Sequence, residues 1–241
     1  MADTHNLDLY ISPEHPCNYL PERQARTVFV DPRLGMDQSL YGVLATHGFR
    51  RSGPYVYRPH CEGCQACVPI RVPVSAFKPD RGQKRVLKRN SDLLCIERPA
   101  EFDPEHFALY GRYVAARHPD GGMASGGETD YRQFLLSPWG KTCLMELRLD
   151  GRLLAVAVTD ELPDALSAVY TFYDPMLPER SLGTYAILIQ IERARRRRLA
   201  WLYLGYWIAE SRKMSYKHRF RPFETLGTDG WQAGAQAAQV E

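Results

Sequence analysis

The hydrophobic pattern changes period near Lys141, and this change constrains the fold more than any other feature of the sequence. Residues 142–149 alternate between apolar and polar side chains, and Asp150-Gly151 then offers a hairpin turn before a second strand-like run at 152–162. A third run follows at 165–175. A loop leading into a helix then occupies 175–198, and a buried-looking strand lies at 199–208. This order predicts an α+β fold with a mostly antiparallel sheet.

The order of three strands, helix and strand resembles the core of the GNAT acyltransferase fold. In that fold, the loop after the third strand and the start of the next helix receive the acyl donor. The free N–H groups of a helix start suit an anion or a carbonyl oxygen, and a glycine lets the backbone approach closely. Ser181 is the candidate cap of the helix. The residues expected at this place are Arg180, Ser181, Gly183 and Thr184.

Residues 1–92 are broken by proline and glycine, and we expect a small irregular region packed on a GNAT-like catalytic domain at 93–228. The region should contain a short helix from Asp37 to Gly48 and a strand near 54–59. In the larger domain, a helix should stop before Pro119, and Thr129 or Asp130 should cap a second helix at 131–137. Residues 229–241 read as a frayed tail.

Two segments concentrate positive charge, although the net charge of the 241-residue chain is only +3. Residues 71–89 carry seven basic side chains against one acidic, and residues 190–225 carry ten against three. Two basic segments on an otherwise acidic body suggest a local footprint for a polyanion such as RNA. In the run at 193–198 the cations point in all directions around a helix, so a cationic helix end is a sufficient explanation there.

The first basic segment contains a helical pattern at 81–89 whose cations fall within an arc of about 140°. A solvated helix face and a phosphate-contacting face both fit this pattern. The absence of acidic residues among these cations favours phosphate contact, because a surface helix without a binding role usually mixes basic residues with Glu. The expected phosphate-contacting residues are Arg81, Lys84, Arg85, Lys88 and Arg89.

The sequence contains no uninterrupted apolar stretch long enough to span a membrane. The first residues also lack a basic region followed by an apolar stretch, so we expect no secretory signal and a cytoplasmic protein. Cysteines in that compartment are thiols or metal ligands rather than disulfides. Three of the six cysteines, at positions 61, 64 and 67, lie at three-residue intervals and supply three thiolates within reach of one centre.

Six stretches together resemble the arginyl/leucyl-tRNA–protein transferase family, specifically its short bacterial branch, the aspartate/glutamate leucyltransferases. They lie in the same order along nearly the whole chain. The stretches are CNYLP at 17–21, HCEGCQACVPIRV at 60–72, RHPDGGM at 117–123, YTFYDP at 170–175, RSLGTYAIL at 180–188, and LYLGYWIAESRKMSYKHRFRPFE at 202–224.

The resemblance implies that leucine moves from leucyl-tRNA to the α-amino group of a protein that begins with Asp or Glu, which marks that protein for N-degron degradation. The nucleophile is an amine of pKa about 7.7–8.0, so a useful minority is already unprotonated near neutral pH. The site must then align amine and ester and stabilise an oxyanion, and no nucleophilic residue or cofactor is required. We therefore assign no certain catalytic residue.

The acceptor's carboxylate needs a cationic reader, and an Arg can bind it through two hydrogen bonds. The basic and aromatic residues interleaved at 216–220 also suit stacking of an unpaired terminal adenine. For Tyr170, Tyr173, Tyr206 and Trp207, packing inside the sheet is the alternative to a role at the aminoacyl-tRNA end. The candidates for contact with acceptor or donor are Arg71, Tyr173, Arg180, Tyr206, Tyr216, Lys217 and Arg219.

The family resemblance points to Cys17 as a fourth partner of Cys61, Cys64 and Cys67, since CNYLP matches half of the cysteine site in longer relatives. This chain departs from them at Leu20, where they place a second cysteine. A zinc ion or iron–sulfur cluster and unmetallated thiols with a packing or redox role are both open. Two other functions also stay open: a GNAT-like acyltransferase with another donor, and a non-enzymatic, metal-dependent RNA-binding module. The residues alone do not separate leucine from arginine as the transferred group.

Overall fold

The computed structural model describes residues 7–117 and 126–234. A sheet of eight strands forms its centre, in the order β14-β13-β7-β12-β11-β10-β9-β8. Its members are β7 (Val68–Pro73), β8 (Leu94–Pro99), β9 (Thr142–Leu149), β10 (Arg152–Glu161), β11 (Ala165–Tyr173), β12 (Trp201–Trp207), β13 (Glu224–Gly227) and β14 (Gly230–Ala233). Neighbouring strands are antiparallel except β11 and β12, so the expected α+β class with a mostly antiparallel sheet is confirmed.

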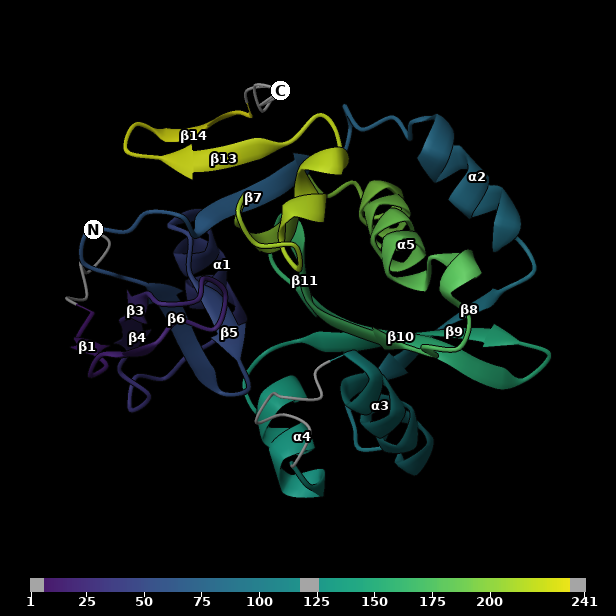
Figure 1. Cartoon of the computed structure of the whole chain (residues 1–241), viewed down its shortest axis with the longest axis horizontal. Coiled ribbons are helices and arrows are strands. Elements are labelled where there is room, and N and C mark those ends of the chain that lie inside the picture. Colours follow the sequence, from purple (N-terminus) through teal and green to yellow (C-terminus); the bar gives the residue numbers. More distant parts are fainter. Residues whose placement is uncertain (1–6, 118–125, 235–241) are drawn as a thin grey trace.

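Helices cover both faces of the large sheet (Figure 1). On one face lie α2 (Arg81–Arg89) and α5 (Leu182–Arg196), and on the other α3 (Pro104–Arg117) and α4 (Glu128–Leu135). Leu188 and Ile191 of α5 are buried and pack in a core together with residues of β7, β11 and β12. Tyr131 and Leu135 of α4 pack with α3 against β10 and β11. No helix in the described ranges is long and apolar enough to cross a membrane.

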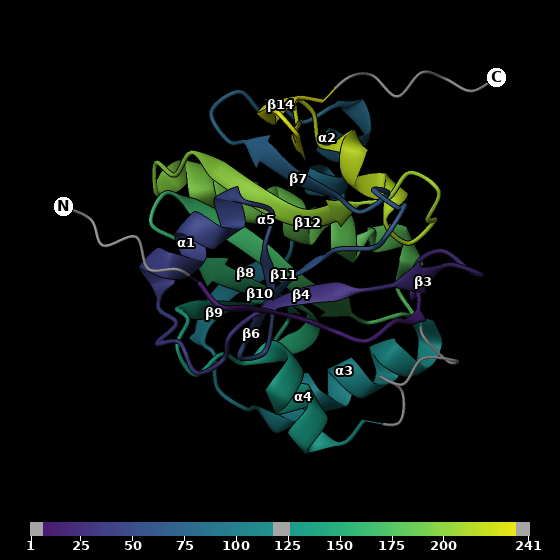
Figure 2. The ribbon, with the colours of Figure 1, turned by 90° about the vertical axis from the view of Figure 1, so that its left-hand side faces the viewer.

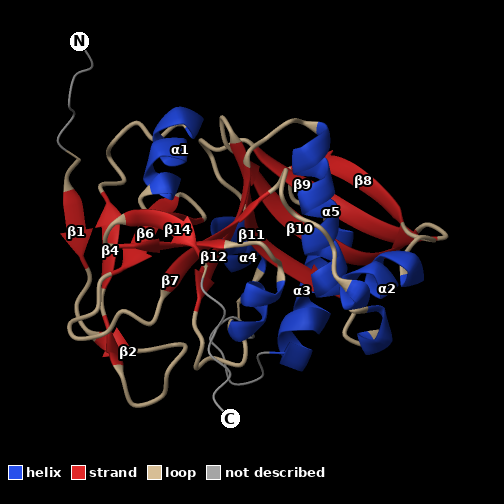
Figure 3. Ribbon diagram, turned by 90° about the horizontal axis from the view of Figure 1, so that it is seen from above, coloured by secondary structure: helices blue, strands red, loops and turns tan. Residues whose placement is uncertain are grey.

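The N-terminal region builds a second, four-stranded sheet in the order β1-β4-β6-β5, at one end of the large sheet (Figures 2 and 3). Its strands are β1 (Leu9–Ile11), β4 (Thr27–Val30), β5 (Arg50–Ser52) and β6 (Tyr55–Pro59), beside α1 (Gln38–Thr46) and the short pair β2 (His15–Pro16) and β3 (Gln24–Ala25). The expected helix is confirmed: the side chain of Asp37 caps it, and Gly48 follows it with φ 82°. The expected strand near 54–59 is β6.

Two N-terminal elements belong to the large sheet and its core rather than to a separate region. β7 lies between β12 and β13 and pairs with both. Val86 and Leu87 of α2 pack against the core beneath α5. The large sheet therefore extends across the expected division at residue 92, because β7, its first strand in sequence order, pairs with β12 and β13, which lie 128 or more residues further along the chain.

Three local expectations were wrong or fall partly outside the described residues. Gly230–Ala233 form β14 and pair with β13, so this part of the expected tail is a strand; residues 235–241 lie outside the described ranges. Helix α4 begins at Glu128, because the Asp130 carboxylate accepts a hydrogen bond from the Gly127 N–H and so lies inside the first turn. Helix α3 ends at Arg117, and Pro119 lies outside the described residues.

Candidate functional site

The two parallel strands at the middle of the large sheet pair over only a short length. β11 and β12 are in register from Ala165–Trp201 to Ser167–Tyr203, although β11 continues to Tyr173 and β12 to Trp207. At Gly205, which has φ 83°, the register of β12 with β7 also shifts. The carboxyl-terminal halves of β11 and β12 therefore diverge and leave a gap in the sheet, here called the splay.

Tyrosines from three elements gather at the end of β11 beside the splay. The Tyr113 ring of α3 lies 4.8 Å from that of Tyr173 and 6.2 Å from that of Tyr170, centroid to centroid. Tyr216, from the short helix η2 (Ser215–Arg219), is close enough to interact electrostatically with Tyr173. Burial raises the pKa of Tyr216 to about 12 and raises the pKa of Tyr113 and Tyr170 further. These hydroxyls therefore stay protonated and can act as hydrogen-bond donors at neutral pH.

The start of α5 adjoins the same tyrosines. Ser181 precedes α5, but it has φ 52° and its side chain makes no capping hydrogen bond, so the expected cap is wrong. The first N–H groups of α5 are thus left without a side-chain partner. A Cβ on Gly183 would lie 3.2 Å from Cε1 of Tyr173, closer than an ordinary contact, so the glycine lets the helix start pack against the ring without a shift of Tyr173.

Helix α2 flanks this site and presents the five expected cations to solvent. Arg81, Lys84, Arg85, Lys88 and Arg89 are all exposed. An Asp80–Gln83 capping box begins the helix, and Gln83 donates to the backbone oxygen of Arg219 in η2. At its other end, Asn90 donates to the backbone oxygen of Arg180, in the short helix η1 (Pro178–Arg180) before α5. The cationic helix is therefore tied to both segments that border the tyrosines, and its contact with tRNA stays a prediction.

Two of the cations expected to read a carboxylate already hold carboxylates of this chain. Arg71 pairs with Glu224 at 2.8 Å, and its guanidinium lies 3.7 Å and 4.2 Å from the ring centroids of Trp201 and Trp231. Arg180 makes two hydrogen bonds of 2.9 Å to Asp92. Since a carboxylate of this chain already offsets the charge of each guanidinium, neither residue is an unpaired cation; Arg219 is exposed on η2.

Lys217, another cation expected to contact the acceptor or donor, is buried in the protein. It is 7% exposed, and its Nζ donates to the backbone oxygen of Tyr206 at 2.8 Å and contacts Met214 Sδ at 3.3 Å. Burial lowers the pKa of Lys217 to about 7, and the charge of Arg50 acts in the same direction. The Tyr206 hydroxyl donates to the backbone oxygen of Gly48, so Tyr206 joins β12 to the N-terminal sheet.

Tyr206 also lines a cavity of about 300 Å³ between the N-terminal sheet and β12. Cys17, Cys61 and Cys67 line it too, so the structure brings together cysteines that the family resemblance associated. Burial raises the pKa of Cys67 to about 12, helped by the nearby Cys61 and Cys17. Cys64 differs, because hydrogen bonds from the Ala66 backbone and Arg23 lower the pKa of its thiol.

The cysteine sulfurs are too far apart in this structure to bind one metal ion together. Among the described residues, the group of three potential ligand atoms within 4.8 Å of one another comprises Asp103, His106 and Glu146, not the cysteines. Glu146 there already pairs with Arg148 at 2.7 Å, which offsets its charge. The three thiols that line the cavity, with Cys64 beside them in sequence, have the donor chemistry for zinc or iron–sulfur, but they would have to move closer together. The cysteine site stays a prediction.

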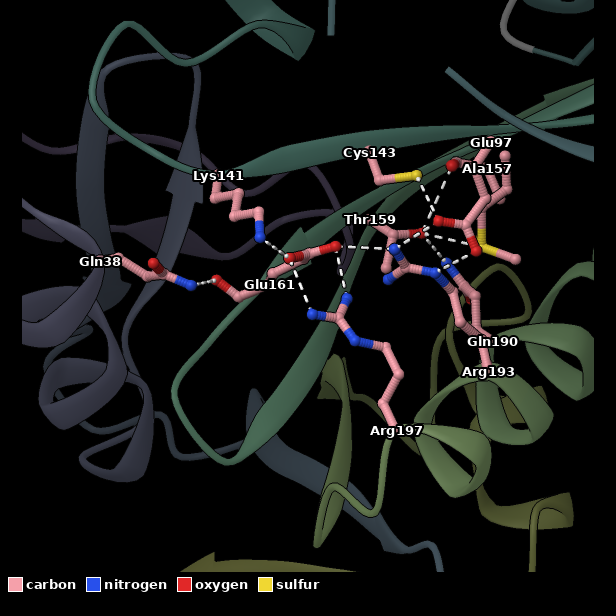
Figure 4. A network of polar contacts seen from close by, with 11 residues as sticks. Gln38, Glu97, Lys141, Cys143, Ala157, Thr159, Glu161, Gln190, Arg193 and Arg197 are labelled. Carbon is pink, nitrogen blue, oxygen red and sulfur yellow. Dashed lines mark hydrogen bonds and ion pairs between the residues drawn. The ribbon is translucent and has the colours of Figure 1, made fainter. Parts of the chain in front are cut away.

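The arginine run at 193–198 has a structural role that explains much of its charge (Figure 4). Arg193 donates to Glu97 and Glu161, and Arg197 donates to Glu161, which Lys141 also pairs with at 2.8 Å. Although burial alone would raise it, hydrogen bonds from Arg197, Lys141 and Arg193 hold the pKa of Glu161 at about 2. The run therefore fixes the end of α5 to β8 and β10.

Sequence reasoning missed Arg50. This residue of β5 reaches into the splay, where it donates to Ser167 Oγ at 3.0 Å and to the backbone oxygen of Ala168 at 2.6 Å. The available signal was two adjacent arginines, Arg50 and Arg51, between Phe49 and Ser52. Both are buried, whereas a strand with one solvated face would bury only one of them.

Two family models match most of the sequence. The model for the N terminus of arginine-tRNA-protein transferase matches residues 15–85, and the model for its C terminus matches residues 105–227. The chain belongs to the arginine-tRNA-protein transferase family. Within this family, aspartate/glutamate leucyltransferases of Hahella chejuensis and Alcanivorax borkumensis are each 50% identical over 231 residues, which is 96% of this chain and 99% and 96% of theirs. A solved structure of L-PGS from Bacillus licheniformis covers 69% of this chain and 49% of its own, with 12% identity and a TM-score of 0.46.

Proposed function

We propose that this chain is an aminoacyltransferase that moves leucine from leucyl-tRNA to the N-terminal α-amine of proteins that begin with Asp or Glu. The observation that carries the proposal is identity of 50% over nearly the whole length with proteins named aspartate/glutamate leucyltransferases. The similarity covers the large sheet as well as the cysteines, so a role limited to RNA binding would leave most of the matched chain without a purpose. The expected product is a protein marked for N-degron degradation, and we place the reaction in the cytoplasm.

We assign the aminoacyl end of the tRNA to the splay and the tyrosines beside it. The start of α5 supplies N–H groups free of a side-chain cap, and Gly183 brings them close to Tyr173. This is the place at which a GNAT-like domain receives its donor, and three antiparallel strands, a helix and a parallel strand supply that order here. The five exposed cations of α2 lie beside it and would receive the phosphates of the tRNA.

The chemistry needs no nucleophilic residue. The acceptor's neutral α-amine attacks the carbonyl carbon of the leucyl ester and forms a tetrahedral oxyanion with a new C–N bond. This intermediate collapses with cleavage of the ester C–O bond, and the proton that the amine nitrogen loses passes to the ribose oxygen, which leaves as a hydroxyl. Protonated tyrosines can donate hydrogen bonds to the oxyanion or to the departing oxygen. Tyr170 suits this role because its hydroxyl is buried and has no hydrogen-bond partner within residues 7–117 and 126–234. The protein's main contribution is to hold amine and ester in line.

The reaction is tested with purified protein, tRNA charged with labelled leucine, arginine or phenylalanine, and peptides starting with Asp, Glu, Lys or Ala. We expect label to move from leucyl-tRNA to the Asp and Glu peptides, and acetylation of their N-termini to abolish transfer. A requirement for coenzyme A in place of tRNA would support the alternative donor. Transfer to Lys peptides alone would refute the acceptor assignment.

A further inference from the structure

Two buried cations at the splay have no acidic partner. The structure describes five buried Lys or Arg side chains: Arg50, Arg51, Arg71, Arg193 and Lys217. Arg51, Arg71 and Arg193 each pair with a carboxylate, at 2.6–2.8 Å. Arg50 bonds only neutral oxygens, from Ser167 and Ala168, and Lys217 bonds the backbone oxygen of Tyr206 and a sulfur.

This arrangement is unfavourable in the free protein. A buried charge is normally paired, because removing it from water costs several kcal/mol that an ion pair offsets. Here the two unpaired cations also lie close enough for the charge of Arg50 to act on Lys217, so each disfavours the other. An anion that binds from outside the chain would offset both charges and so explain why the two cations lie there.

The fold holds both cations firmly in this place. The guanidinium of Arg50 passes beside β12 at Gly205, where a Cβ would lie in ordinary contact with Arg50 Nε, Cζ and Nη2 at 3.4–3.5 Å. The two hydrogen bonds of Arg50 fall on β11 at the point where its pairing with β12 ends. Lys217 is held from the other strand through Tyr206. The two cations thus bridge the start of the splay.

The cavity beside Tyr206 provides room for a side chain next to these cations. Arg50 and Lys217 lie behind its lining residues: Tyr57, which lines the cavity, is the antiparallel partner of Arg50, and Tyr206, which also lines it, accepts the Lys217 hydrogen bond on its backbone oxygen. Its volume of about 300 Å³ is at the lower end of ligand pockets, which suits one amino-acid residue. A nucleic-acid backbone needs an accessible surface instead, and the exposed cations of α2 already offer one.

We propose that Arg50 and Lys217 together bind the side-chain carboxylate of the acceptor's first residue and so determine its specificity for Asp or Glu. This inference rests on the proposed function and adds the residues that select the acceptor. A guanidinium and an ammonium can each donate to the two carboxylate oxygens. Two cations against one carboxylate also leave a net positive charge, which favours the neutral form of the neighbouring α-amine and therefore its attack.

The test compares peptides that differ only in charge at the first residue. Leucyl transfer to Asp and Asn peptides is measured for the wild type, Arg50→Met and Lys217→Met. The expected ratio of kcat/KM for Asp over Asn falls about 10- to 100-fold in each variant, the effect typical of one hydrogen bond to a charged group. Arg71→Met is the matched control, since Arg71 is buried but paired with Glu224, and its ratio should stay that of the wild type.

A ratio within one protein does not depend on how much of the protein is folded. If a Met variant gives no folded protein, Arg50→Gln and Lys217→Gln retain hydrogen-bond donors, remove the charge and carry the same expectation. Binding of labelled Asp and Asn peptides without tRNA provides a second readout that needs no activity. Wild-type preference for the Asp peptide in binding, without transfer, would refute the proposed reaction while supporting the carboxylate site.

Two outcomes would overturn the inference. One is an unchanged Asp-to-Asn ratio in the Arg50 and Lys217 variants of a protein that transfers leucine. The other is a loss of tRNA affinity in these variants with the ratio unchanged, which would assign the two cations to an RNA phosphate.

Discussion

Neutralising the exposed face of α2 should weaken tRNA binding in a salt-dependent manner. The variant replaces Arg81, Lys84, Arg85 and Lys88 with Gln. Arg89 is kept, because its guanidinium donates to the backbone oxygen of Glu179 and helps to fix the helix end. The four replaced side chains are exposed, and the capping box and the buried contacts of α2 are unchanged. The fold should therefore survive.

The magnitude follows from the number of phosphates that these cations can neutralise. Each phosphate contact contributes about 0.9 to the slope of log K against log salt on a duplex, so four contacts contribute about 3 to 4. Between 50 and 200 mM salt, four such contacts weaken wild-type binding about 100-fold, and the variant should lose this part of the dependence. Filter binding or fluorescence anisotropy with leucyl-tRNA at several salt concentrations measures both slopes.

The matched control removes the same charge from other exposed positions: Arg98, Arg132, Arg196 and Arg198. We expect its salt slope to differ little from the wild type. An equal loss of slope in the control would show that net charge, not the α2 face, governs binding. An unchanged slope in the α2 variant would show that this helix does not contact the tRNA phosphates and is an ordinary solvated surface.

Two further predictions concern the Glu161 network and the cysteines. The pKa of Glu161 is lowered from 4.5 to about 2, so its ionised form stabilises the fold by about 3 kcal/mol above pH 4.5, and this contribution is lost as the pH falls towards 2. Glu161→Gln should thus lower the free energy of urea unfolding at pH 7 and flatten its acid dependence; equal curves for both proteins would contradict this. Metal analysis of anaerobically purified protein tests the cysteine site. If the protein holds zinc or iron, Cys67→Ala should lose the metal and Cys143→Ala should retain it. Retention of the metal in both variants would exclude the cavity cysteines as its ligands.

Local pattern in the sequence determined the elements well. The alternation after Lys141, the Asp150-Gly151 turn and the basic helix at 81–89 each depend on residues a few positions apart, so propensity and periodicity suffice to predict them. Cap assignments were less secure. Ser181 has a capping side chain, but its φ of 52° directs that side chain away from the role, and backbone conformation of this kind is set by the surrounding packing.

Tertiary structure alone decided which charged residues are free. Arg71 and Arg180 look like carboxylate readers in the sequence, yet Glu224 and Asp92, from strands and loops far along the chain, occupy them. Arg50 carries no motif, and it lies in the splay because β5 packs against β11 more than 100 residues away. Whether a buried cation is paired depends on contacts between distant segments, and a single sequence does not record these contacts. The sequence therefore determined the elements and the family resemblance, while the tertiary structure decided which cations are available to a substrate.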